Sequence, residues 1–193
     1  MPESNNYNRL ATLYLLSVVL FMVIAAATSW PMPEISFRSD NSPVSWLSSA
    51  QLWAGAVISG RLLVERALPG RLALVLFSSM VLMSFDEQFM FHELWKYTCS
   101  NWFSLCKYSW MREMPMVLVA IGGVAITIWL SKALVGWGRW LLILGVSLGM
   151  VALSKDVLGS FESIGAYEEA VEVLAEALFI SSLLGIRAKR EIV

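Results

Sequence analysis

The sequence predicts an all-α, polytopic membrane protein: a bundle of about six transmembrane helices that forms one domain over residues 1–193. Two observations carry this prediction. The chain is 58% hydrophobic and only 15% charged, whereas soluble domains are about 25% charged. Its apolar residues also gather into runs of about twenty, the length that a helix needs to cross a bilayer.

Six such runs follow one another along the chain, each separated from the next by polar residues or helix breakers. They cover residues 10–30, 46–65, 71–93, 115–132, 140–157 and 167–186. The first ends at SWPMPE, whose two prolines cannot continue a helix, and ALPG closes the second. A long aromatic connection, KYTCSNWFSLCKYSWMRE, separates the third run from the fourth, which begins near a favoured first-turn proline, Pro115. No linker or repeat divides the chain.

The basic residues predict how the helices are oriented, because short cytoplasmic loops are enriched in Lys and Arg. With six spans and the N-terminus inside, the cytoplasmic side holds nine: Arg9, Arg61, Arg66, Arg71, Lys132, Arg139, Arg187, Lys189 and Arg190. The outer side holds five: Arg38, Lys96, Lys107, Arg112 and Lys155. We therefore expect a multipass protein of the bacterial inner (cytoplasmic) membrane with both termini cytoplasmic.

The net charge of −1 gives no reason to expect nucleic acid as a partner. The expected partners are the lipid bilayer and other membrane proteins.

The last predicted span carries an acidic face. At about 100° per residue, four glutamates share one arc of about 100°: Glu168, Glu169, Glu172 and Glu176. Glu176 would then lie near the middle of the bilayer, where a charge costs several kcal/mol. We expect this carboxylate to face a polar interior, to bind a cation or to be protonated.

The third predicted span ends in FDEQFMFHE, which holds the single histidine of the chain, His92. On a straight helix, Asp86 and Glu93 would share a face, with Glu87 and His92 to either side of it. At matching depth, these groups would meet the acids of the last span in a pocket that opens outward between the third, fifth and sixth spans. The candidate ligands are Asp86, Glu87, His92, Glu93, Glu169, Glu172 and Glu176, and the other expected pocket residues are Lys155, Asp156 and Arg112.

Carboxylates with one imidazole suit a divalent metal such as Fe, Mn or Zn. The leading hypothesis is a site for such a metal or for a cationic substrate, with a catalytic role left open. Two alternatives stand beside it. The chain could be a structural or assembly subunit whose acids are paired internally, or it could translocate protons or cations.

Cys99 and Cys106 both fall in the predicted outer connection. In an oxidising compartment they would form a disulfide that closes this connection. The aromatic residues around them are typical of the membrane interface. Four glycines are expected to mark close contacts between helices: Gly122, Gly123, Gly145 and Gly149.

The pair FDEQFMFHE and YEEAVEVLAE resembles a pattern in uncharacterised bacterial multipass membrane proteins, in which a DE…HE stretch ends one span and an EExxE stretch opens a later one. The resemblance covers about thirty residues and implies a membrane protein without implying an activity. Membrane hydrolases of the alkaline-ceramidase type hold zinc with an acid and three histidines. This chain has one histidine, so that activity is not inferred.

Overall fold

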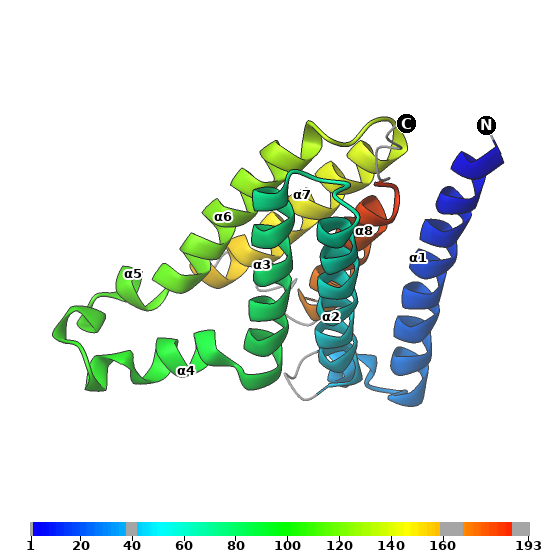
Figure 1. The fold of residues 1–193 in the computed structure, drawn as a ribbon. Coiled ribbons are helices and arrows are strands. Elements are labelled where there is room, and N and C mark those ends of the chain that lie inside the picture. The colour runs from blue at the N-terminus through cyan, green and yellow to red at the C-terminus, as the bar shows by residue number, and fades with distance from the viewer. Residues whose placement is uncertain (1, 38–41, 159–167, 187–193) are drawn as a thin grey trace.

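The computed structural model describes residues 2–37, 42–158 and 168–186, and these ranges consist of helices joined by turns and short irregular segments, with no strand. The all-α prediction is therefore confirmed for the described residues. Six long helices dominate the structure (Figure 1). They are α1 (Pro2–Thr28), α2 (Pro43–Val64), α3 (Gly70–Phe89), α6 (Met114–Ser131), α7 (Trp137–Leu158) and α8 (Glu168–Leu184).

Four of these helices are long and apolar enough to cross a membrane. The segments that qualify are 7–28 in α1, 70–89 in α3, 114–131 in α6 and 137–154 in α7. The protein is thus a membrane protein by composition. Helices α2 and α8 match the two remaining predicted spans in position. Serines and Gln51 lower the mean hydropathy of α2, and α8 is 17 residues long and begins with glutamates.

Helix α8 lies in the middle of the bundle and packs against α1, α2 and α7. Helix α2 packs between α3 and α8, and α6 lies against α7 on the side away from α1 (Figure 1). We call the end of the bundle at which α3 finishes the hairpin end. Helices α2 and α8 both start at the hairpin end and run away from it, and α3 runs toward it (Figure 1).

A largely aliphatic core fills the half of the bundle away from the hairpin end. Leu62 of α2, Leu72 and Leu76 of α3 and Leu183 of α8 belong to one buried cluster. Within a bilayer, such side chains bring helices together through van der Waals packing, because lipid tails are as apolar as leucine. This cluster holds α2, α3 and α8 together on the side opposite the acids.

Helix α3 is shorter than the predicted third span, which was expected to run to Glu93. It ends at Phe89, because Met90 has a left-handed backbone with φ 53° and ψ 44°. A non-glycine residue pays a steric penalty in this conformation. After Met90 the chain turns into a separate short helix, α4 (Phe91–Thr98), which runs across the direction of α3 (Figure 1).

The connection from α4 to α6, residues 91–113, forms what we call the disulfide hairpin. Its further elements are η2 (Cys99–Asn101), η3 (Ser104–Lys107) and α5 (Ser109–Arg112). The predicted disulfide between Cys99 and Cys106 is present, and both residues are buried. Trp95 Nε1 donates to the Met111 carbonyl oxygen at 3.2 Å, and Lys96 Nζ lies 3.6 Å from Glu113 Oε2.

The four glycines differ in what they permit. A Cβ atom on Gly145 of α7 would meet the Ala175 carbonyl oxygen of α8 at 2.8 Å, and on Gly149 it would meet Ala175 Cβ at 3.7 Å. On Gly122 or Gly123 of α6 it would meet nothing within 4 Å. The expected close contact is therefore present between α7 and α8, and the two glycines of α6 make none with the described residues.

Candidate functional site

Glu176 is the deepest acid on α8, and its carboxylate points at α2. Ser48 Oγ donates a hydrogen bond to Glu176 Oε1 at 2.8 Å. The other oxygen, Glu176 Oε2, is shielded from solvent and has no hydrogen-bond partner among the described residues. The residue as a whole is partly buried.

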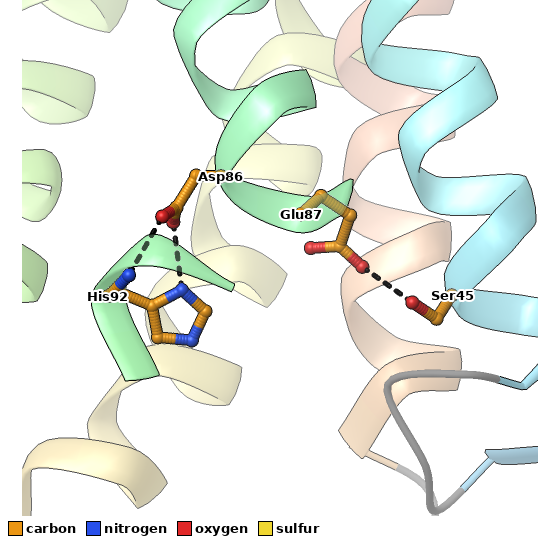
Figure 2. Close-up of polar contacts among 4 residues, drawn as sticks. All are labelled: Ser45, Asp86, Glu87 and His92. Atoms are coloured by element: carbon orange, nitrogen blue, oxygen red, sulfur yellow. Dashed lines mark hydrogen bonds and ion pairs between the residues drawn. The ribbon is translucent and has the colours of Figure 1, made fainter. Parts of the chain in front are cut away.

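Glu87 of α3 and Glu176 of α8 both face α2. Ser45 Oγ donates to Glu87 Oε1 at 3.2 Å across the gap between α2 and α3, as Figure 2 shows. Glu87, Glu172 and Glu169 all interact electrostatically with Glu176. We call these four carboxylates, with the hydroxyls of Ser45 and Ser48, the acidic cluster.

Tyr14 and Gln51 border the acidic cluster where α1, α2 and α8 meet. The Tyr14 hydroxyl donates to Gln51 Oε1 at 2.7 Å, and Gln51 Nε2 donates to the Val173 carbonyl oxygen at 3.4 Å. Tyr14 also interacts electrostatically with Glu176. This pair satisfies its own polar groups in the middle of the bundle, where an unmade hydrogen bond costs about 1–3 kcal/mol.

The polar face of α2 was missed at the sequence level. Six polar residues of α2 and its N-cap are buried: Ser42, Ser45, Ser48, Ser49, Gln51 and Ser59. The signal was present, because Ser45, Ser48 and Gln51 follow one another at intervals of three and so occupy one helix face. The expected meeting place lay between the third, fifth and sixth spans, whereas the acidic cluster also involves α2, which supplies the hydroxyls for both Glu87 and Glu176.

Asp86 and His92 form a separate pair at the junction of α3 and α4. Asp86 Oδ1 accepts from the His92 backbone N–H at 2.9 Å, and Asp86 Oδ2 lies 2.8 Å from His92 Nδ1. Figure 2 shows this pair on one side of α3 and the Glu87–Ser45 contact on the other. The imidazole and the Glu87 carboxylate therefore do not converge.

The shared face expected for Asp86 and Glu93 is wrong, because the helix breaks between them at Met90. Glu93 is partly exposed in the first turn of α4. Arg112 is exposed at the end of α5 in the disulfide hairpin. The side chains of Lys155 and Asp156 lie outside the described part of the chain. Of the seven predicted ligands, the structure brings together four: Glu87, Glu169, Glu172 and Glu176.

The described residues contain no group of three or more His, Cys, Asp or Glu side chains placed to hold a metal ion. The donors that do gather are all oxygen atoms. They comprise carboxylates, serine hydroxyls and, at the border, the phenol of Tyr14 and the amide oxygen of Gln51. Oxygen donors of this kind suit hard cations such as Mg²⁺, Ca²⁺ and Mn²⁺ better than soft ones.

An open hollow of about 540 Å³ lies elsewhere, on the outward face of α2 and α3. Trp46, Trp53 and Phe85 are among its lining residues, and none of its lining residues belongs to the acidic cluster. The hollow and the acidic cluster therefore lie on different faces of α2 and share no residue.

The polar interior stops at Glu176 and Gln51. Beyond them, away from the hairpin end, residues 10–13 of α1, 52–60 of α2, 72–85 of α3 and 177–184 of α8 carry no charged side chain. The buried aliphatic cluster occupies this half, with a few hydroxyls such as Ser59, which donates to the carbonyl oxygen of Gly55 on its own helix. Within the described helices, the acidic cluster is therefore continuous with the hairpin end alone.

No protein-family model, curated protein or solved structure matches the chain. The function is therefore argued from the geometry of the acidic cluster.

Proposed function

We propose that this integral membrane protein binds a cation at the acidic cluster, with access from the hairpin end, and that all six long helices cross the membrane. One observation carries the proposal. The Glu176 carboxylate lies deep in the bundle with one oxygen bonded to Ser48 and the other, Oε2, shielded from solvent without a partner.

The energetics of a buried carboxylate favour a bound cation. Removing a carboxylate from water costs several kcal/mol unless an opposite charge and hydrogen bonds compensate. The described residues give Glu176 one hydroxyl donor and no ion pair. The groups that interact with it electrostatically are three further carboxylates, which add negative charge rather than neutralise it. A cation that enters from the hairpin end would supply the compensation.

The donor atoms favour a hard divalent ion. Of the three metals that the sequence suggested, Mn²⁺ suits an oxygen site best, whereas Fe and Zn sites commonly include imidazole or thiolate. His92, the one imidazole of the chain, is engaged with Asp86. We therefore assign the cation to the carboxylates and hydroxyls, without His92.

A proton is the second candidate for the same place. It is favoured by the spacing of the acids, since no three of them in the described part converge at metal-binding distances. A protonated Glu176 would remove the charge without bringing its neighbours closer. The uncharged half of the bundle beyond Glu176 favours binding over translocation for either occupant, because a transfer path needs polar groups on both sides.

The test is a metal titration of the detergent-purified protein, followed by thermal unfolding. We expect Mn²⁺ to raise the unfolding midpoint of the wild type, because a ligand at a hundred times its Kd stabilises the folded state by about 2.7 kcal/mol. Glu176→Gln should keep the hydrogen bond from Ser48 and lose the metal effect. The matched control is Glu65→Gln, which removes an exposed carboxylate paired with Arg61 and should leave the effect intact.

The outcomes separate the two candidates. A metal effect that survives in Glu176→Gln would place the ion elsewhere and contradict the cation proposal. If neither Mn²⁺, Mg²⁺ nor Ca²⁺ shifts the wild type, and Glu176→Gln is more stable than wild type at neutral pH, the occupant is a proton. Elemental analysis of the wild type and of a Glu172→Ala variant adds a check on tightly held metal.

A further inference from the structure

We infer that the disulfide hairpin, residues 91–113, lies in the headgroup layer of the membrane and binds the phosphates of its lipids. This inference does not rest on the proposed cation site. It rests on the position of the hairpin, its exposed apolar side chains, its internal cross-links and its exposed cations.

The position follows from the helices on either side. The hairpin connects α3 to α6, and each of these is long and apolar enough to cross a membrane. Both ends of the hairpin are therefore fixed at the same membrane surface. The left-handed backbone of Met90 turns the chain so that α4 runs across the direction of α3 (Figure 1). The hairpin thus extends along the surface instead of away from it.

The hairpin exposes many large apolar side chains. On α4, Phe91, Leu94 and Tyr97 are 53%, 50% and 70% exposed and share one face, since they follow one another at intervals of three. Five more are exposed in the rest of the hairpin: Trp102, Phe103, Leu105, Tyr108 and Trp110. An apolar surface of this extent marks a contact with a membrane or a protein. Its mixture of Trp and Tyr is typical of the membrane interface.

The cross-links prevent the hairpin from burying these residues in itself. Of residues 91–113, only Cys99 and Cys106 are buried, and they form the disulfide. The hydrogen bond from Trp95 to Met111 and the ion pair of Lys96 with Glu113 join the two arms. The apolar face is therefore held outward.

The exposed cations select lipid as the occupant. Lys107 and Arg112 are both exposed in the hairpin. Its three basic residues, which include Lys96, outnumber its two acids, Glu93 and Glu113, and the charge of Glu113 is matched by Lys96. Lys and Arg are attracted to lipid phosphates at a membrane surface, and the aromatic residues beside them would enter the acyl boundary. A hairpin tethered at both ends to membrane helices meets this surface without any further partner.

The experiment uses the tryptophan emission of the full chain in nanodiscs whose lipids carry bromine high on the acyl chains. The emission of Trp102 and Trp110 is obtained by subtracting the emission of the double variant Trp102→Phe, Trp110→Phe from that of the wild type. We expect the brominated lipid to quench most of this difference and aqueous iodide to quench little of it. The pair Trp137→Phe, Trp140→Phe, which removes two exposed residues at the start of α7, is the matched control at another part of the membrane-facing surface.

Two results would overturn the inference. Quenching of the difference by iodide and not by brominated lipid would place the hairpin in water. Protection from both quenchers in the nanodiscs would assign the surface to a contact with protein. For the phosphate contact, Lys107→Glu, Arg112→Glu should lower quenching by brominated lipid and raise quenching by iodide. An unchanged ratio, with the disulfide intact by mass after alkylation, would contradict that contact.

Discussion

Ser48 makes the one hydrogen bond that the described residues give to the Glu176 carboxylate. A hydrogen bond to a buried charged group contributes about 1.5–3 kcal/mol, and leaving its partner unsatisfied costs a similar amount. The hydroxyl of Ser48 therefore contributes measurably to the stability of the folded protein. It satisfies an oxygen whose sister atom, Oε2, already lacks a partner.

We predict that Ser48→Ala lowers the free energy of unfolding by about 1–3 kcal/mol in metal-free protein. The matched control is Ser59→Ala on the same helix. Ser59 is equally buried, but its hydroxyl bonds only the Gly55 carbonyl oxygen of its own helix. Such a local bond adds little to stability, so this variant should change the free energy by only a few tenths of a kcal/mol. Denaturant titration of both variants measures the difference, and equal losses would contradict the role given to Ser48.

At the scale of the helix pair, the contact of α7 with α8 depends on the missing side chain of Gly145. A Cβ atom there would approach the Ala175 carbonyl oxygen at 2.8 Å, the Phe179 backbone nitrogen at 3.0 Å and Leu178 Cβ at 3.1 Å. Two of these three atoms belong to the α8 backbone, so a shift of one flexible side chain cannot relieve the clash. Helix α8 carries Glu172 and Glu176, so this contact also positions the acidic cluster.

We predict that Gly145→Ala destabilises the protein by about 1–3 kcal/mol, the usual result of overpacking, because α8 must move away from α7. Gly122→Ala on α6 is the control, since its Cβ would meet nothing within 4 Å. There the better helix propensity of Ala should leave stability equal or slightly higher. Thermal unfolding in the same detergent compares the two. A Gly145→Ala variant as stable as Gly122→Ala would contradict the close packing.

The helices were predictable from the sequence where a breaker or a change in polarity marks their ends. Pro31, Pro33 and the ALPG turn end or separate helices because proline and glycine do so in any context. The end of α3 carried no such signal. Met90 takes a left-handed conformation that its residue type does not favour. Because the sequence does not reveal this break, the positions of Asp86 and Glu93 around the helix axis were predicted as if one straight helix joined them.

The acidic cluster was predictable in part for a similar reason. Glu169, Glu172 and Glu176 lie on one helix, so their spacing predicts their common face. Their meeting with Glu87 depends on how helices pack, and the placement of α2 between α3 and α8 is not encoded in any local pattern. The serines of α2 reduced its mean hydropathy and were counted as part of a span, although their spacing marks the face that meets the acids.

For the whole molecule, polarity is divided along the bundle. The acidic cluster lies toward the hairpin end, beside a second buried apolar cluster that includes Val18, Met22 and Val44, and the aliphatic cluster around Leu72, Leu76 and Leu183 fills the other half. Within the described helices, the buried carboxylates are therefore confined to the hairpin half of the bundle, and the buried cluster of the other half is apolar. This division fits a protein that binds at one surface better than one that passes ions through.

The connections between the helices also predict the membrane topology. Helix α2 packs along α3 and reaches it through a short turn, residues 65–69. Two helices joined in this way run antiparallel over the same depth, so we expect α2 to cross wherever α3 crosses. Helix α8 packs along α2 and α7, so we expect it to cross as well, which would give six crossings and an even count. The turn at residue 66 and the disulfide hairpin should then lie on opposite sides, with Arg61, Arg66 and Arg71 placing the turn in the cytoplasm.

We test this with single cysteines at Arg66 and at Ser104 and a membrane-impermeant maleimide in intact cells, after removal of the outer membrane barrier. The native Cys99 and Cys106 form a disulfide and should not react. We expect labelling at position 104 and none at position 66 until the membrane is opened, because a charged reagent does not cross the bilayer. Labelling at position 66 in intact cells would show that α2 and α3 do not cross as a pair or that the orientation is reversed, and labelling at 104 in the same cells distinguishes the two. A reversed orientation would place the acidic cluster on the cytoplasmic side, so this result decides from which compartment a cation would reach Glu176.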